Sequence, residues 1–146
     1  MAYFTCDTST IISRKLSDLP DNFLFSSIVL MELMASAVDE TQRKVYERVH
    51  RAYEKDNSLI VPDTEDWLTA SKVLFSLSQA RRHSSSKGRA LRQLPGATQR
   101  MALDVLIAVS ARRWSTTVIT ENWEDFKAIQ RYCKFKLTKG SDFFKR

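Results

Sequence analysis

Residues 101–126 read MALDVLIAVSARRWSTTVITENWEDF, and this stretch decides the fold class. Its first part is the apolar centre of an expected helix over residues 98–113, and a β-branched run follows from Thr116 to Thr120. Another helix is expected over residues 122–131. A strongly apolar strand between two helices is typical of a parallel sheet that is covered by helices on both faces.

The same alternation continues outward along the chain. Strands are expected at residues 3–6, 23–26, 58–61 and 135–137, and further helices after Asp7, after Ser26 through about Val38, and over residues 39–56 and 64–82. We therefore predict one domain over residues 1–146. Its fold class is α/β, a three-layer α/β/α arrangement around a mostly parallel sheet of four or five strands.

The composition excludes several classes of protein. A chain of 146 residues with 43% hydrophobic and 10% aromatic residues can fill the core of a single domain, which excludes disorder over most of its length. No apolar run approaches the roughly 20 residues of a membrane span, and no secretory signal is visible, so we expect a cytoplasmic protein without membrane contact. Cys6 and Cys133 are then expected to be buried thiols. Three glycines exclude Gly-rich nucleotide-binding loops.

Basic residues dominate two segments, and the formal net charge is +6. One segment includes an expected basic loop over residues 83–97, and the other an expected basic C-terminal tail over residues 138–146. Such charge favours a polyanionic or acidic partner, although a solvated loop and tail is an equally simple interpretation. The candidate phosphate-binding residues are Arg81, Arg82, Lys87 and Arg89.

Four acidic residues stand where an α/β sheet places its ligands, outside the carboxyl ends of the strands. Asp7 follows the first strand, Glu32 and Asp104 interrupt apolar helices, and Asp125 lies in the first turn of the last long helix. Each has a local alternative: Asp7 and Asp125 as helix caps, Glu32 as part of a polar stripe, and Asp104 as the ion-pair partner of Arg100.

Gathered at one sheet edge, four carboxylates would repel one another unless a cation compensates their charge. Oxygen ligands without histidine or cysteine suit Mg²⁺ or Mn²⁺. Such ions activate water and stabilise phosphoryl oxygens, which is what hydrolysis of a phosphodiester requires.

Three blocks of the sequence resemble the PIN domain, the nuclease fold of VapC-type toxin–antitoxin ribonucleases. The first is Cys6-Asp7-Thr8-Ser9 after its strand, and the second is Ser27-Ile28-Val29-Leu30-Met31-Glu32-Leu33. The third joins the helical run Asp104-Val105-Leu106-Ile107-Ala108-Val109-Ser110-Ala111 to the later segment Thr120-Glu121-Asn122-Trp123-Glu124-Asp125-Phe126. The resemblance implies a site whose metal-binding carboxylates are Asp7, Glu32, Asp104 and Asp125, with Thr120 and Asn122 orienting the attacking water or the phosphate.

By this resemblance we expect a divalent-metal-dependent endoribonuclease that uses Mg²⁺ or Mn²⁺ and acts as the toxin of a toxin–antitoxin pair. RNA would be its substrate, a cognate antitoxin its inhibitor, and a homodimer its assembly. Two alternatives stay open at this point. One is a non-catalytic module that binds nucleic acid or an acidic partner, and the other is an RNA-processing nuclease unrelated to toxicity.

Overall fold

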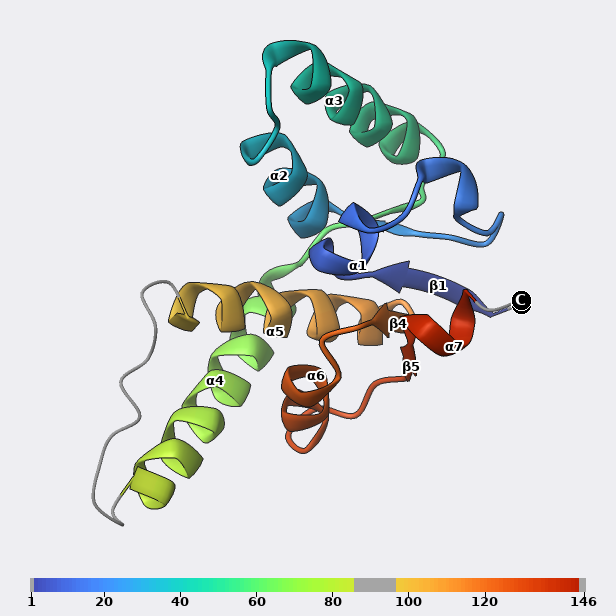
Figure 1. The fold of residues 1–146 in the computed structure, drawn as a ribbon. Coiled ribbons are helices and arrows are strands. Elements are labelled where there is room, and N and C mark those ends of the chain that lie inside the picture. The colour runs from blue at the N-terminus through green and yellow to red at the C-terminus, as the bar shows by residue number, and fades with distance from the viewer. Residues whose placement is uncertain (1, 86–96, 145–146) are drawn as a thin grey trace.

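A computed structural model describes residues 2–85 and 97–144 of the chain (Figure 1). Its strands are β1 (Tyr3–Cys6), β2 (Phe25–Ser26), β3 (Leu59–Ile60), β4 (Thr116–Thr120) and β5 (Leu137–Lys139). All the pairings are parallel, as the alternating pattern predicts. Parallel pairing brings the carboxyl ends of neighbouring strands to the same edge, which is where the acidic residues were expected.

The strands form two small sheets instead of the predicted sheet of four or five strands. One has the order β1-β4-β5 and the other pairs β2 with β3. They meet at a single bridge between Phe4 and Phe23, where Leu24 N donates to Phe4 O at 2.7 Å. One bridge is too short a ladder to merge the two sheets, so the prediction of one larger sheet is wrong in strand count and correct in architecture.

Helices lie on both sides of these strands, as Figure 1 shows with α2 and α3 on one side and α4, α5 and α6 on the other. The helical segments are α1 (Thr8–Ile12), η1 (Leu16–Asp18), α2 (Ser27–Ala35), α3 (Glu40–Lys55), α4 (Thr64–Ser85), α5 (Ala97–Arg113), α6 (Trp123–Gln130) and α7 (Gly140–Phe143). The architecture is therefore the predicted three-layer α/β/α arrangement.

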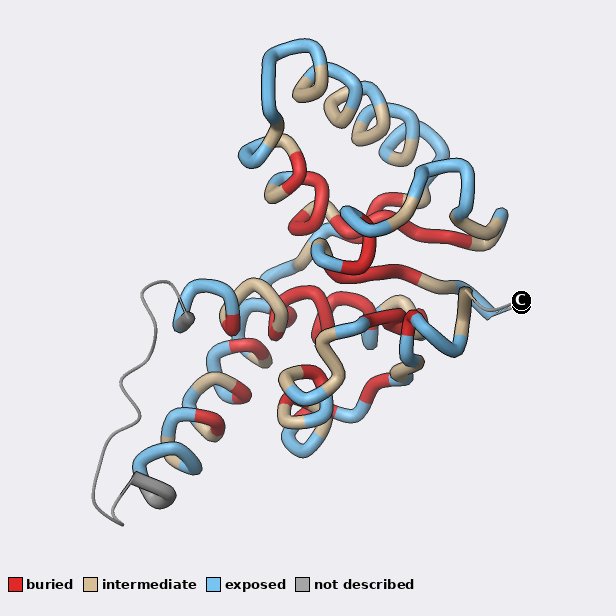
Figure 2. The backbone as a smooth tube through the Cα atoms, in the orientation of Figure 1, coloured by how far each residue is buried: buried red, intermediate tan, exposed pale blue. Residues whose placement is uncertain are grey.

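The core lies where the strands meet α2 and α5 (Figure 2). Val105, Val118 and Phe126 are fully buried there, and Cys6 and Cys133 are buried free thiols as predicted. Burial raises the pKa of the Cys6 thiol. Within residues 2–85 and 97–144, no helix has the length and apolar character needed to cross a bilayer.

Three boundaries differ from the sequence-based predictions for local reasons. Helix α2 ends at Ala35 because the Ser36 hydroxyl donates back to the Glu32 carbonyl at 2.8 Å. Strand β5 begins two residues later than predicted. The Phe135 carbonyl accepts a hydrogen bond from Gln130 Nε2 at 2.8 Å and is therefore not part of the strand pairing. Helix α4 continues through Ser85 into the segment predicted as a loop.

The C-terminal segment also differs from the expected tail. Residues 138–139 belong to β5, and α7 follows at once. The Phe143 ring of α7 packs 4.8 Å from the Phe4 ring of β1. This contact packs α7 against β1.

Candidate functional site

The Asp7 carboxylate lies at the carboxyl end of β1 and is only 3% exposed. Its Oδ2 accepts hydrogen bonds from Thr120 Oγ1 at 2.9 Å and from Ser9 Oγ at 3.1 Å. Its Oδ1 is buried and has no hydrogen-bond partner. Although Asp7 precedes α1, its side chain makes no capping bond, so the helix-cap interpretation is wrong. An orphaned buried carboxylate oxygen is costly and marks a place where a ligand would be stabilised.

Glu32 reaches the same region from α2, the helix that follows β2. Its Oε1 accepts a hydrogen bond from Thr8 Oγ1 at 2.7 Å, and Thr8 directly follows Asp7. The polar-stripe interpretation does not hold, because Asp39 caps α3 by accepting from Gln42 N at 2.8 Å.

Asp104 contributes the third of these acidic side chains, from α5. Its pKa is raised from 3.8 to about 7, first by burial and then by three neighbouring carboxylates. Those carboxylates belong to Asp7, Glu32 and Asp125. The Arg100 guanidinium acts in the opposite direction and is the weakest of these influences. Asp104 thus lies within electrostatic reach of the three other acids that the sequence singled out.

Thr120 and Asn122 connect β4 to the fourth acid. The Asn122 backbone N donates to Thr120 Oγ1 at 2.9 Å, and the Asn122 side-chain Nδ2 donates to Asp125 Oδ2 at 3.0 Å. Asn122 makes no side-chain cap on α6, and Asp125 is held by a side-chain amide instead of closing a capping box. Thr120 is fully buried and bonded to Asp7 and Asn122 at once, so it sets the relative positions of the two.

A cavity of about 380 Å³ lies beside two of these acids, Asp104 and Asp125. Its lining residues are Arg81, Arg100, Met101, Asp104, Asn122 and Asp125. Arg81 therefore lies at the acidic site, and Arg82 is exposed beside it on α4. Lys87 and Arg89 lie outside the described residues. Arg100 was expected only as an ion-pair partner of Asp104, although its place one helical turn before Asp104 could have suggested that it faces the site.

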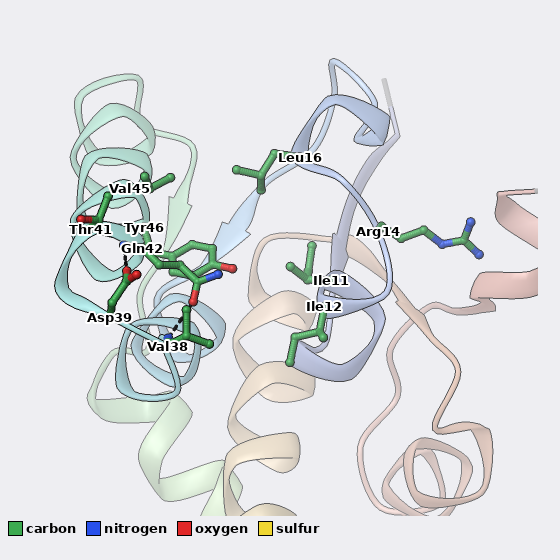
Figure 3. Close-up of a pocket in the computed structure, with 10 residues that line it drawn as sticks. All are labelled: Ile11, Ile12, Arg14, Leu16, Val38, Asp39, Thr41, Gln42, Val45 and Tyr46. Carbon is green, nitrogen blue, oxygen red and sulfur yellow. Dashed lines mark hydrogen bonds between the residues drawn. The ribbon is translucent and has the colours of Figure 1, made fainter.

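A larger cavity of about 620 Å³ lies between α1 and η1 on one side and the start of α3 on the other (Figure 3). Apolar side chains such as Ile12, Leu16 and Val38 line much of it. The carboxylate on its wall belongs to Asp39, which is engaged as the cap of α3. Its lining carries no acidic cluster, so the smaller cavity is the candidate site.

The donor set of the smaller cavity fits a hard divalent cation. Its acidic side chains are those of Asp104 and Asp125, and the buried Asp7 Oδ1, which does not line the cavity, has no partner. In the described part of the chain, no three acidic, histidine or cysteine side chains are close enough together to enclose a metal ion. Binding of one ion by three or four of these carboxylates therefore requires their side chains to move closer together. Without a cation, mutual repulsion keeps the carboxylates apart.

Comparison with known proteins gives structural neighbours only. No protein-family model and no curated protein sequence matches the chain. A chain of DNA-bound VapBC from Salmonella typhimurium matches with a TM-score of 0.58 and 20% identity, covering 96% of this chain and 99% of that one. A chain of FitAB bound to the IR36 DNA fragment matches with a TM-score of 0.55 and 17% identity, covering 94% of each. A chain of VapBC-1 from nontypeable Haemophilus influenzae matches with a TM-score of 0.53 and 20% identity, covering 97% of this chain and 99% of that one.

These neighbours define the class of fold. The chain shares it over nearly its whole length and over nearly the whole length of each neighbour, which confirms the PIN-like α/β/α fold predicted from the three sequence blocks. At such identities the likeness extends to the fold alone, and activity has to be argued from the site.

Proposed function

We propose that this chain is a divalent-metal-dependent endoribonuclease that hydrolyses RNA phosphodiesters and acts as the toxin of a toxin–antitoxin pair. The observation that carries the proposal is the buried Asp7 carboxylate at the carboxyl end of β1, whose Oδ1 has no partner and whose Oδ2 is held by Thr120. Asp104 supports it, because its pKa is raised by burial and by the charges of Asp7, Glu32 and Asp125. Asp104 and Asp125 line a cavity together with Arg81 and Arg100, and Thr120 links Asp7 to Asn122 in the same cavity wall. An acidic centre beside two arginines suits a metal ion together with a phosphate.

The chain's own side chains have distinct parts in this proposal. Asp7, Glu32, Asp104 and Asp125 would hold the cation. When bound, a Mg²⁺ or Mn²⁺ ion supplies activation of water and neutralises charge on phosphoryl oxygens. Thr120 holds Asp7 in place through its hydroxyl, and Asn122 holds Asp125 through its amide. Arg81 and Arg100 attract the phosphate to the cavity and offset its charge.

The partners belong to the proposal as well. The neighbouring structures are VapBC and FitAB complexes, which supports a cognate antitoxin as the inhibitor of this chain. The net charge of +6 supports RNA as the polyanionic substrate. We further propose a homodimer that works in the cytoplasm.

The deciding experiment replaces Asp7 or Asp104 by Asn and measures cleavage of a labelled RNA in Mg²⁺ or Mn²⁺. We expect cleavage to fall by at least about 100-fold in each variant, because the removed charge is needed to hold the cation. Expression of the wild type should arrest growth, and expression of either variant should not. Circular dichroism should show that both variants fold.

Asp56→Asn is the matched control, because Asp56 is an exposed carboxylate at the end of α3. It should cut RNA and arrest growth like the wild type. If Asp7→Asn and Asp104→Asn cut RNA at the wild-type rate, the proposed site is wrong. RNA binding that EDTA does not affect, without cleavage in either metal, would instead identify a non-catalytic binding module. Cleavage without growth arrest would remove the toxin assignment and leave the nuclease.

A further inference from the structure

Lys139 occupies the same sheet edge as the acidic site. It is the last residue of β5, and it pairs with Thr120 of β4, whose hydroxyl is bonded to Asp7. Neighbouring strands lie about 4.8 Å apart, so Lys139 stands roughly two strand spacings, about 10 Å, from the end of β1. The other basic residues that precede it, Lys134 and Lys136, lie before β5 begins and therefore toward the opposite edge of the sheet.

The half-buried Trp123 ring brings a second lysine to this place. Trp123 follows Asn122 of the site and begins α6. Lys139 Nζ lies 5.2 Å from the centre of the ring, and Lys127 Nζ lies 5.5 Å from it. Lys127 is four residues after Trp123 on α6, and its Nζ also donates to Gln130 Oε1 at 3.0 Å. Two ammonium groups from different elements thus lie near the same indole ring.

This arrangement concentrates positive charge that the protein leaves without a carboxylate partner. Within the described residues, neither Lys127 nor Lys139 forms an ion pair, and both are exposed. The nearby Glu121 carboxylate lies against Gly140, where glycine has no side chain to obstruct it. Attraction between a cation and an aromatic ring is enough to hold a side chain in position, but it is weaker than a charge-assisted bond to phosphate.

We propose that Lys127 and Lys139 bind the backbone phosphates of a single-stranded RNA where it leaves the acidic cavity across β5. Trp123 is the positioning residue that holds both ammonium groups toward the strand. The inference rests on the proposed function, because RNA is the substrate there. Arg81 and Arg100 then flank the acids from α4 and α5, and the lysine pair flanks them from α6 and β5. The ring faces two cations already, which favours phosphate contact over stacking of a base on Trp123.

Binding should be measured in the Asp7→Asn background, so that the RNA stays intact. The readout is fluorescence anisotropy of a labelled single-stranded RNA over a series of salt concentrations. Lys127→Ala/Lys139→Ala should weaken binding about tenfold and reduce the slope of log affinity against log salt by about 1.4, since each phosphate contact to a single strand contributes about 0.7. In the cleaving protein, the same pair should raise KM and leave kcat nearly unchanged.

Lys134→Ala/Lys136→Ala is the matched control, because it removes the same charge near the other edge of the sheet. It should change affinity and slope much less. Equal losses in the two double variants would show that only the net charge matters and would overturn the specific role of Lys127 and Lys139. Unchanged binding in Lys127→Ala/Lys139→Ala would overturn the proposal even if the wild type cleaves RNA. Absence of cleavage by the wild type would defeat the proposed function instead.

Trp123 needs a separate test, in which Trp123→Phe keeps a ring and Trp123→Leu removes it. Trp123→Phe should retain most of the affinity, and Trp123→Leu should lose about as much as the double lysine variant. A Trp67→Phe/Trp114→Phe protein leaves Trp123 as the sole indole for fluorescence. Strong quenching by RNA that persists in Lys127→Ala/Lys139→Ala would show base stacking and contradict the phosphate contact.

Discussion

Thr120 shows how one side chain organises the site at the scale of single residues. Its hydroxyl donates to Asp7 Oδ2 and accepts from the Asn122 backbone N. A hydroxyl that both donates and accepts in a buried place leaves neither group unsatisfied, which a valine of similar shape could not do. The β-branched side chain also suits the strand, so a single residue meets a structural and a functional requirement.

Asp104 makes the stability of the metal-free protein depend on pH. Folding raises the pKa of this carboxyl from 3.8 to about 7, so the folded chain binds the proton more tightly than the unfolded chain. The stabilisation is complete below about pH 4 and is lost as the pH rises through about 7. We expect the Tm of the metal-free wild type to fall by a few degrees, roughly, between pH 5 and pH 8.

Thermal unfolding of Asp104→Asn in EDTA provides the comparison. The variant should lose most of this pH dependence and should unfold at a higher temperature than the wild type at pH 8, because the amide carries no charge to repel the other acids. An identical slope of Tm against pH in the two proteins would show that the carboxylates do not interact as described.

At the scale of elements, α4 and α5 bring arginines to the acidic cavity. Arg81 from α4 and Arg100 from α5 both line it, and Arg82 is exposed next to Arg81. In a cleavage-deficient Asp7→Asn protein, Arg81→Ala/Arg82→Ala should weaken RNA binding and flatten its salt dependence by roughly 0.7 for each lost phosphate contact. The salt dependence of fluorescence anisotropy measures both effects.

Arg48→Ala/Arg51→Ala on α3 removes the same charge away from this cavity and serves as the control. Of the four predicted phosphate-binding residues, Arg81 and Arg82 lie on the described part of α4. Lys87 and Arg89 lie outside the described residues, and their part in RNA binding stays a prediction. An unchanged salt slope in Arg81→Ala/Arg82→Ala would leave these two arginines as ordinary surface charges.

At the scale of the whole molecule, the site joins strands and helices that are far apart in the chain. A cation bound only by the folded state therefore stabilises the entire fold. Millimolar Mg²⁺ or Mn²⁺ should raise the Tm of the wild type by roughly a few degrees, and EDTA should reverse the shift. Differential scanning calorimetry with and without the metal measures it.

The same titration in Asp7→Asn and Asp104→Asn should give little or no shift, and Asp56→Asn should behave like the wild type. A shift of equal size in all four proteins would mean that the ion binds elsewhere. No shift in the wild type would contradict the proposed metal site.

The order of elements could be predicted because its signals are local. The run from Thr116 to Thr120 is β-branched and forms β4 with the predicted bounds, and Asp39 caps α3 at the predicted start of that helix. Element ends were predicted less well where side chains compete for backbone groups, as Ser36 and Gln130 do. The division into two sheets could not be predicted, because it depends on how few bonds join β1 to β2.

The amino-acid order alone determined the α/β class and singled out the four acids, because periodicity, turn residues and polar interruptions of apolar runs are properties of neighbouring residues. Tertiary structure alone decided that Thr120 bonds Asp7 across 113 positions of the chain and that Trp123 gathers Lys127 and Lys139. It also decided the pKa of Asp104, which depends first on burial and then on three carboxylates from other segments. Electrostatic and hydrogen-bond energies depend on distances in space, and those distances exist only once the chain has folded.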